Sequence, residues 1–115
     1  MAETLGAFEQ AVLLAILHPR PASGGEVYGR AILKEVQSRL QRDVSASAVY
    51  ATLDRLEQKG LISSWTEPGS AVRGGRPRRH YKLESKGLRA LHASRAATRR
   101  LWGNVRLPFT IKGSV

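Results

Sequence analysis

The sequence contains no cysteine, few acidic side chains and no long apolar run. Without cysteine the chain of 115 residues cannot form disulfides, use a thiol nucleophile or bind zinc through thiolates, and a cytoplasmic location is expected. Its apolar stretch Ala11–Leu17 is shorter than the roughly 20 residues of a membrane span, and it lacks the cationic start of a signal peptide. These absences indicate one small cytoplasmic domain with a thin core.

Positive charge is in large excess. Nineteen lysines and arginines stand against nine acidic residues, which gives a net charge of +10 and an isoelectric point near 11.1. A surplus of this size repels itself in the folded state and is usually matched to a polyanion. Nucleic acid is the leading partner, with an acidic membrane surface, ribosomal RNA or a merely soluble basic protein as alternatives.

The order of apolar residues predicts three helices, a hairpin and a fourth helix. The first follows Thr4 as its cap and ends before Pro19, the second spans residues 26–40, and the third follows Ser45 or Ser47 as N-cap and ends at Gly60. Residues 61–65 and 80–83 are expected to be short strands, with Ile62, Tyr81 and Leu83 facing inward, and residues 85–102 form the last helix.

This order is typical of a winged helix-turn-helix, a mainly α fold with a small β-hairpin. We expect residues 1–84 to form the DNA-binding domain and residues 85–105 a C-terminal dimerisation helix, followed by a weakly patterned tail at 106–115.

The third helix has the two faces that a helix in the DNA major groove requires. Val49, Leu53 and Leu56 recur at helical spacing and would anchor it. The residues expected to face outward are small or polar: Ser45, Ser47, Ala48, Ala51, Thr52 and Arg55, with Tyr50 beside them. The Tyr50 hydroxyl either reaches phosphate or base, or its ring packs at the helix edge.

The predicted hairpin is rich in arginine. Residues 73–82 contain five cations and no acid: Arg73, Arg76, Arg78, Arg79 and Lys82. Arginines on a thin loop suit the negative potential of a narrow minor groove, although a solvated charged loop is the alternative. Arg78 and Arg79 are adjacent in a strand and should point to opposite sides.

Several separated segments resemble the PadR-like family of transcriptional regulators. Residues 44–62 resemble its recognition-helix signature, a small-residue opening and a tyrosine followed by L-x-R-L-E-x-x-G-L-I. Residues 5–9 and Val27-Tyr28-Gly29 resemble the openings of its first two helices, residues 75–83 resemble its wing, and Gly87 fits a glycine of its last helix. Together these matches cover residues 5–102 in the family's order.

The resemblance implies a repressor that binds a palindromic operator as a homodimer and is released by a small molecule or another cue. It places these residues at DNA, with Arg76 and its neighbours in the wing: Tyr28, Ser45, Ser47, Ala48, Tyr50 and Thr52. Two features depart from the family. Glu84 stands where a threonine usually caps the last helix, and Ala51-Thr52 replaces a proline-leucine pair of the family's signature.

A patchy apolar stripe without a strict heptad runs along the last helix, so a simple coiled coil does not follow. Packing against the partner's first helix is the expected arrangement, through Leu5, Phe8, Val12, Leu88, Leu91, Thr98, Leu101 and Trp102. The helix arginines either meet partner acids such as Glu3 and Glu9 or are solvated. Trp102 is expected to pack in the interface, and a planar effector stacked on it is the alternative.

No enzyme activity, metal or cofactor is predicted. His18, His80 and His92 look isolated, without paired carboxylates or metal-ligand spacing, and Gly74-Gly75-Arg76 is no phosphate-binding loop. The rival to a regulator of double-stranded DNA is an RNA-binding or protein-interaction winged helix, because one fold serves several functions.

Overall fold

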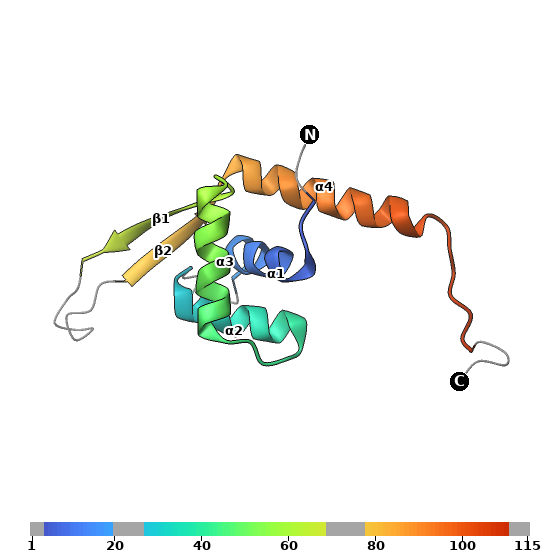
Figure 1. Cartoon of the computed structure of the whole chain (residues 1–115), viewed down its shortest axis with the longest axis horizontal. Helices are drawn as coiled ribbons and strands as arrows, with labels where there is room; N and C mark the ends of the chain where they lie inside the picture. The colour runs from blue at the N-terminus through green and yellow to red at the C-terminus, as the bar shows by residue number, and fades with distance from the viewer. Residues whose placement is uncertain (1–3, 20–26, 69–77, 111–115) are drawn as a thin grey trace.

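The computed structural model describes residues 4–19, 27–68 and 78–110. The elements are α1 (Ala7–Leu17), α2 (Gly29–Leu40), α3 (Ala46–Gln58), β1 (Ile62–Glu67), β2 (Arg78–Leu83) and α4 (Ser85–Trp102). In Figure 1, α1 lies at the centre between α2 and α4, and the hairpin and the free end of α4 point in opposite directions. This is the mainly α winged helix-turn-helix expected from the sequence.

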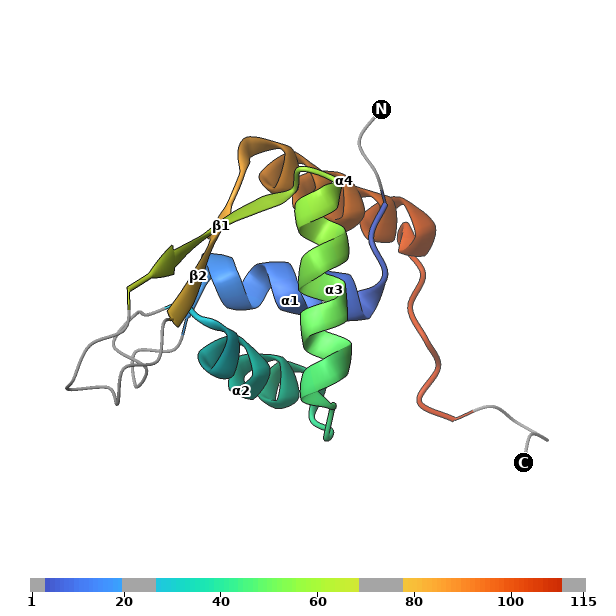
Figure 2. The same ribbon diagram turned by 60° about the vertical axis from the view of Figure 1, so that its left-hand side comes forward.

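Helix α1 is the centre of the core, packed against α2, α3, β2 and α4 (Figure 2). A helix that is apolar on most sides is buried on most sides, and Ala11, Val12, Leu13, Ala15 and Ile16 are all buried. Leu5 and Val12, which we expected to face a partner, are 4% and 0% exposed and lie within the chain's own core. The helix begins at Ala7, so its N-cap is Gly6 rather than Thr4, and the Gly6 amide donates a hydrogen bond to the Glu9 carboxylate at 3.2 Å.

Helices α2 and α3 form the helix-turn-helix. Helix α2 begins at Gly29, three residues later than expected, and ends at Leu40, where the C-cap Gln41 adopts the left-handed conformation with φ 56°. Ser45 caps α3 as predicted, since its Oγ accepts a hydrogen bond from the Ala48 amide at 3.1 Å. The anchoring residues Val49, Leu53 and Leu56 are each 0% exposed, which confirms the predicted inner face of α3.

The hairpin is antiparallel and its strands extend beyond the predicted ends, to Glu67 in β1 and from Arg78 in β2. Ile62 and Tyr81 are buried, as expected, and Leu83 packs against the core. Residues 27 and 28 lie beside β2, where the Tyr81 amide donates to the Val27 carbonyl at 2.9 Å and Tyr28 bridges to His80. The base of the wing is therefore fastened to the start of α2.

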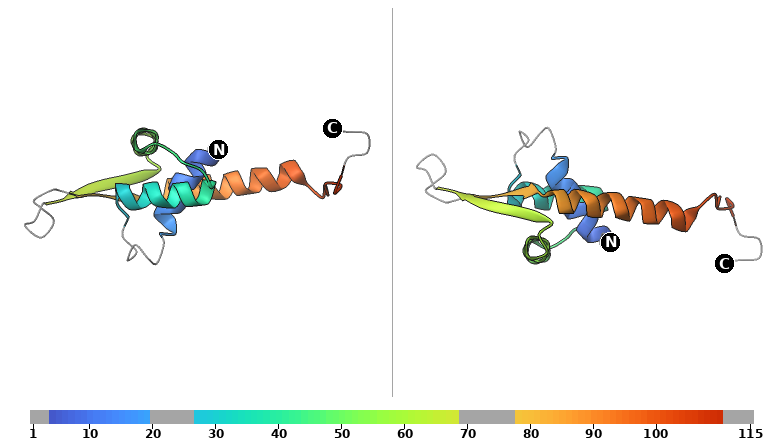
Figure 3. Two further views of the ribbon diagram at one scale, coloured as in Figure 1. Left: turned by 90° about the horizontal axis from the view of Figure 1, so that it is seen from below. Right: turned by 90° about the horizontal axis from the view of Figure 1, so that it is seen from above.

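Helix α4 leaves the hairpin and passes over α1 (Figure 3). Gly87 allows its first turn to approach the backbone, because a Cβ there would overlap the Leu61 carbonyl oxygen. Ser94 is buried and its Oγ accepts a hydrogen bond from the Leu5 amide at 2.9 Å. Glu84 makes no side-chain cap and instead accepts a hydrogen bond from the Ser63 hydroxyl at 2.7 Å.

Beyond α4, residues 103–110 continue without helix or strand, and all of them are exposed. Of the tail predicted at 106–115, residues 111–115 lie outside the described residues. None of the helices described is long and apolar enough to cross a membrane.

Candidate nucleic-acid interface

The first half of α3 presents a small, uncharged surface. Ser45, Ser47, Ala48 and Ala51 are exposed, and no acidic residue lies in the first turn. The Ser45 and Ser47 hydroxyls lie 3.2 Å apart, within hydrogen-bonding distance. Because small side chains allow close approach and a helix N-terminus carries partial positive charge, this end of α3 can come close to a base edge or a phosphate.

Thr52 does not face outward as expected. It is 2% exposed, and its Oγ1 accepts a hydrogen bond from Nη2 of Arg55 at 3.1 Å. The position follows Val49 by three residues and precedes Leu56 by four, so it belongs to the inner face of the helix. Thr52 therefore orients the exposed Arg55 side chain rather than lying on the surface itself.

Tyr50 packs at the edge of α3, one of the two alternatives that the sequence left open, and remains partly exposed. Its side chain is 42% exposed, and its ring lies over Gly29 at the start of α2. A Cβ at Gly29 would come within 2.5 Å of the Tyr50 hydroxyl and ring, so only glycine allows this packing. The ring is thus held against α2, while 42% of the residue's surface stays exposed.

An aromatic cluster lies at the base of the wing, around His80. The His80 ring stacks on Trp65 at 5.2 Å between centroids and meets Tyr28 edge-on at 6.3 Å. His80 Nε2 shares a hydrogen bond with Glu67 Oε2 at 2.7 Å, and the Arg78 guanidinium lies 4.7 Å from the centre of the Tyr28 ring. The expectation that His80 lacks a paired carboxylate is wrong, because the hairpin register brings Glu67 beside it.

Arg79 contacts a different element from Arg78, as their alternation along β2 predicts. Its Nη2 forms a salt bridge with Glu57 Oε1 of α3 at 3.0 Å, and its Nε donates to the Ser64 hydroxyl at 3.0 Å. Glu57 also accepts a hydrogen bond from Ser64 at 2.7 Å. No acid occurs within residues 73–82, and no local pattern indicates that α3 supplies the carboxylate that pairs with Arg79.

Tyr81, next to Arg79, is buried on the inner side of the hairpin. Loss of hydration by burial raises the pKa of its hydroxyl above the ordinary value of 10.0, and the positive charge of Arg79 partly offsets this. Arg73 and Arg76 of the predicted wing lie outside the described residues.

The residues predicted for dimerisation fall into two groups. Leu5 and Val12 are buried in the core, and Phe8 and Leu91 pack against it with part of their surface exposed. The other four predicted residues belong to α4 and are exposed to solvent: Leu88, Thr98, Leu101 and Trp102. Within the described ranges, no group of three or more histidine or acidic side chains could hold a metal ion.

Three comparisons with known proteins bear on the assignment. Residues 14–93 match the model of the transcriptional regulator PadR-like family. A PadR-family regulator from Eggerthella lenta is 28% identical with a TM-score of 0.59, over 78% of this chain and 72% of its own. A PadR-like regulator from Bacillus cereus is 26% identical with a TM-score of 0.60, over 85% of this chain and 82% of its own.

A third structure, Bacillus subtilis PadR in complex with operator DNA, is 21% identical and has a TM-score of 0.61. The match covers 93% of this chain and 54% of that protein, and at this identity it shows a shared fold. A search of curated protein sequences found no match. Because the family model covers well over half of the chain and the fold agrees, the protein belongs to the PadR-like family of transcriptional regulators, which are not enzymes.

Proposed function

We propose that the protein binds a specific double-stranded operator as a homodimer and represses transcription. The observation that carries the proposal is that α3, whose first half is exposed, is joined at its C-terminal end to a hairpin that carries Arg78 and Arg79. Helix α3 enters the major groove, and the wing follows the adjacent backbone and minor groove. The shared fold with Bacillus subtilis PadR, whose structure contains operator DNA, supports this arrangement.

Within α3, the proposed base- and backbone-facing residues are Ser45, Ser47, Ala48, Tyr50 and Arg55, and Thr52 is left out because it is buried. Arg55 is the long cation of this surface, and its hydrogen bond to Thr52 fixes one end of the guanidinium. Tyr28 contributes through Arg78, whose guanidinium lies over its ring. Arg73, Arg76 and Arg79 complete the proposed phosphate contacts of the wing.

Homodimerisation is proposed through α4 and the exposed part of α1. Leu88, Leu101 and Trp102 expose 42%, 82% and 48% of their surface, which is unusual for large apolar side chains on a small domain. Leu88 and Trp102, fourteen residues apart, lie on one side of α4, whereas Leu101 lies on another side. Exposed apolar side chains on one side of a helix are typical of a subunit interface.

Release by a planar effector is the last part of the proposal and rests on Trp102. Its indole is about half exposed, so a planar compound can stack on it. Candidate planar compounds should quench tryptophan fluorescence in the wild-type protein and leave a Trp102→Ala variant unchanged. Trp65 is also exposed, so a Trp65→Phe variant serves as the matched control.

A gel-shift experiment tests the proposal directly. Genomic fragments that include the DNA upstream of the protein's own gene are compared with RNA of equal length. Retention of one DNA fragment against excess non-specific DNA supports the regulator, and equal retention of RNA supports the rival basic binder. Tyr50→Ala and Arg55→Ala should each weaken specific binding by roughly 1–3 kcal/mol while changing non-specific binding less.

A further inference from the structure

The positive charge of the chain is concentrated in its C-terminal part. Residues 85–115 contain seven lysines and arginines and no acid, because the last acidic residue is Glu84. The first 84 residues, which include α3 and the hairpin, contain twelve cations and nine acids, a net charge of +3 out of the total of +10. Binding of an operator by α3 and the wing therefore explains the smaller share of the surplus, and the larger share calls for a second polyanionic partner.

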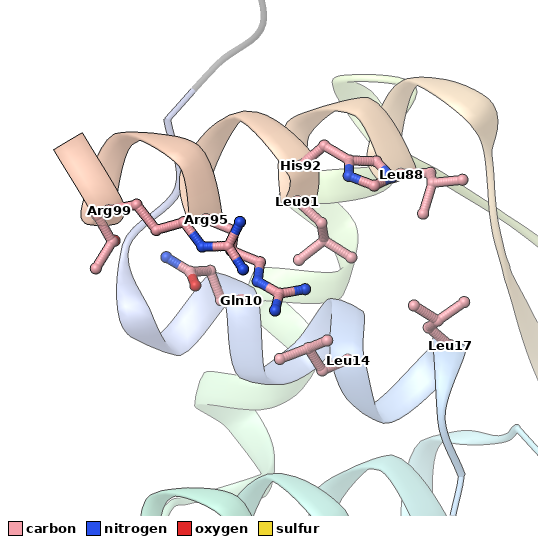
Figure 4. A pocket seen from close by; sticks show the side chains of 9 residues that line it. Gln10, Leu14, Leu17, Leu88, Leu91, His92, Arg95 and Arg99 are labelled. Atoms are coloured by element: carbon pink, nitrogen blue, oxygen red, sulfur yellow. The ribbon is translucent and has the colours of Figure 1, made fainter.

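The cations at the end of α4 are accessible to such a partner. Arg95 and Arg99 line the groove between α1 and α4, next to the side of α4 proposed for the homodimer (Figure 4). Arg100 and Arg106 are exposed, and among the residues that the structure describes no ion pair involves either of them. These two arginines are therefore left to meet negative charge supplied from outside the chain.

Large apolar side chains lie in the same stretch, which we call the C-terminal segment and define as residues 100–110. Val105, Leu107 and Phe109 expose 63%, 70% and 104% of their surface, and Figure 1 shows the chain behind α4 running away from the body of the molecule. The three residues occupy alternate positions, so in an extended chain they lie on one side and Arg106 lies on the other. Apolar side chains exposed together in this way mark an interaction site.

We propose that the C-terminal segment binds the surface of a membrane that contains anionic lipids. Such a bilayer has both features that the segment needs, negative headgroups for Arg100 and Arg106 and an apolar boundary beneath them for the alternate apolar side chains. Trp102 lies between the two arginines in sequence, and indole rings prefer the level of the headgroups. The binding is peripheral, since none of the helices described is long and apolar enough to cross a membrane.

Two other partners match only part of the segment. DNA offers phosphates to the arginines but leaves Val105, Leu107 and Phe109 in water. A second copy of this chain offers apolar surface, but its own residues 85–115 carry the same seven cations and no acid, so the positive charges would repel one another. The combination of arginines and exposed apolar side chains therefore favours an anionic bilayer over both.

Flotation of the full-length protein with lipid vesicles tests the proposal. The protein should float with vesicles of phosphatidylglycerol and phosphatidylcholine in equal parts, and it should stay in solution with phosphatidylcholine alone. Leu107→Ser combined with Phe109→Ser should lower the partition coefficient by about tenfold or more, because two large apolar side chains are lost. Arg100→Gln combined with Arg106→Gln should lower it by about fivefold for each arginine. Absence of flotation with the anionic vesicles would refute the proposal.

The matched control for the arginine pair is Arg30→Gln combined with Lys34→Gln, which removes two exposed cations from α2. Vesicle binding of this control should stay close to that of the wild type. An equal loss in the control and in the arginine pair would overturn the proposal, because net charge alone would then explain the attachment.

The serine pair distinguishes the bilayer from the other two partners. Phe109 is fully exposed, so the circular dichroism of Leu107→Ser combined with Phe109→Ser should equal that of the wild type. Operator binding should also be kept, because the hairpin and the free end of α4 point in opposite directions (Figure 1). A serine pair that floats like the wild type but loses self-association would identify a second copy as the partner of the segment. Loss of DNA binding with unchanged flotation would identify DNA.

Tryptophan fluorescence locates the contact, since the chain has only two tryptophans. Trp65→Phe leaves Trp102 as the single reporter, and anionic vesicles should shift its emission to shorter wavelength and protect it from quenching by acrylamide. Trp102→Phe leaves Trp65, which is 54% exposed in β1, and its emission should stay unchanged. A shift of Trp65 without a shift of Trp102 would place the membrane contact in the wing and overturn the inference.

Discussion

Gly87 and Gly29 both contact another element, but the atoms that they contact differ in how far they can move. A Cβ at Gly87 would overlap the Leu61 carbonyl and come within 2.7 Å of Leu83. A Cβ at Gly29 would meet the ring of Tyr50, a side chain that is 42% exposed and able to swing outward. Gly87 is therefore needed for the packing of the fold, and Gly29 is needed for the position of Tyr50, a proposed DNA contact.

Gly87→Ala should lower the free energy of unfolding by about 1–2 kcal/mol, because the cost of overpacking exceeds the gain in helix propensity. Gly29→Ala should change stability less and weaken specific DNA binding through displacement of Tyr50. Urea denaturation and operator binding of the two variants make the comparison. Equal loss of stability in both variants would show that Tyr50 cannot move aside.

Tyr81 should make stability fall at high pH. Burial raises the pKa of its hydroxyl in the folded state above 10.0, the ordinary value expected in the unfolded chain. At a pH between the two pKa values, Tyr81 is ionised in the unfolded chain and neutral in the folded protein. The stability contribution is complete below about pH 10 and is lost as the pH rises through the folded-state pKa. The difference in free energy of unfolding between about pH 9 and about pH 11 should be smaller in Tyr81→Phe than in the wild type. A pH dependence identical in both proteins would rule out this role.

At the scale of elements, local signals predicted most of the fold. The Ser45 cap, the buried stripe of α3 and the inward residues of β1 and β2 follow from spacing and from residues next to one another in sequence. The central position of α1 was not predicted, because a helix that is apolar on most sides shows that it is buried but not what covers it. Leu5 and Val12 were assigned to a partner for that reason.

The contacts of the wing were also beyond prediction. His80 meets Glu67, and Arg79 meets Glu57, only when the strand register and the docking of the hairpin on α3 are known. Residues 68–77 separate the two strands, and a connection of this length does not fix which residues pair. Thr52 was predicted to face outward because only Val49, Leu53 and Leu56 were assigned to the inner face of α3. The buried face is wider than those three residues and includes Thr52.

Glu57→Gln should strengthen non-specific DNA binding. The substitution keeps the shape of the side chain but removes the charge that partly neutralises Arg79, and each additional phosphate contact adds about 0.9 to the salt slope. Because the pair is half exposed, stability should fall by less than about 1 kcal/mol. Titration of random-sequence DNA at several salt concentrations measures the slope.

Glu9→Gln is the matched control, since it changes the net charge equally but lies in α1, where Glu9 is 3.7 Å from Lys59. Its salt slope should equal that of the wild type. An equal rise in both variants would mean that net charge, rather than the position of Arg79, sets the slope.

For the whole molecule, the charge of +10 and the proposed two-fold symmetry act together. Each substitution in the wing changes both copies, so Arg76→Ala should weaken specific and non-specific binding and reduce the salt slope by about 1.8 per dimer. The measurement is the dependence of the observed affinity on salt concentration. An unchanged slope would mean that residue 76 does not contact phosphate.

The triangle of Glu57, Ser64 and Arg79 joins the end of α3 to both strands of the hairpin. These contacts hold the helix and the hairpin at a fixed distance and angle, so the two elements do not move independently. In an operator with one base pair inserted between the positions contacted by the helix and by the hairpin, one element would keep its DNA contacts and the other would lose them. Such insertions should be tolerated far less than changes of base identity at positions that only the hairpin touches.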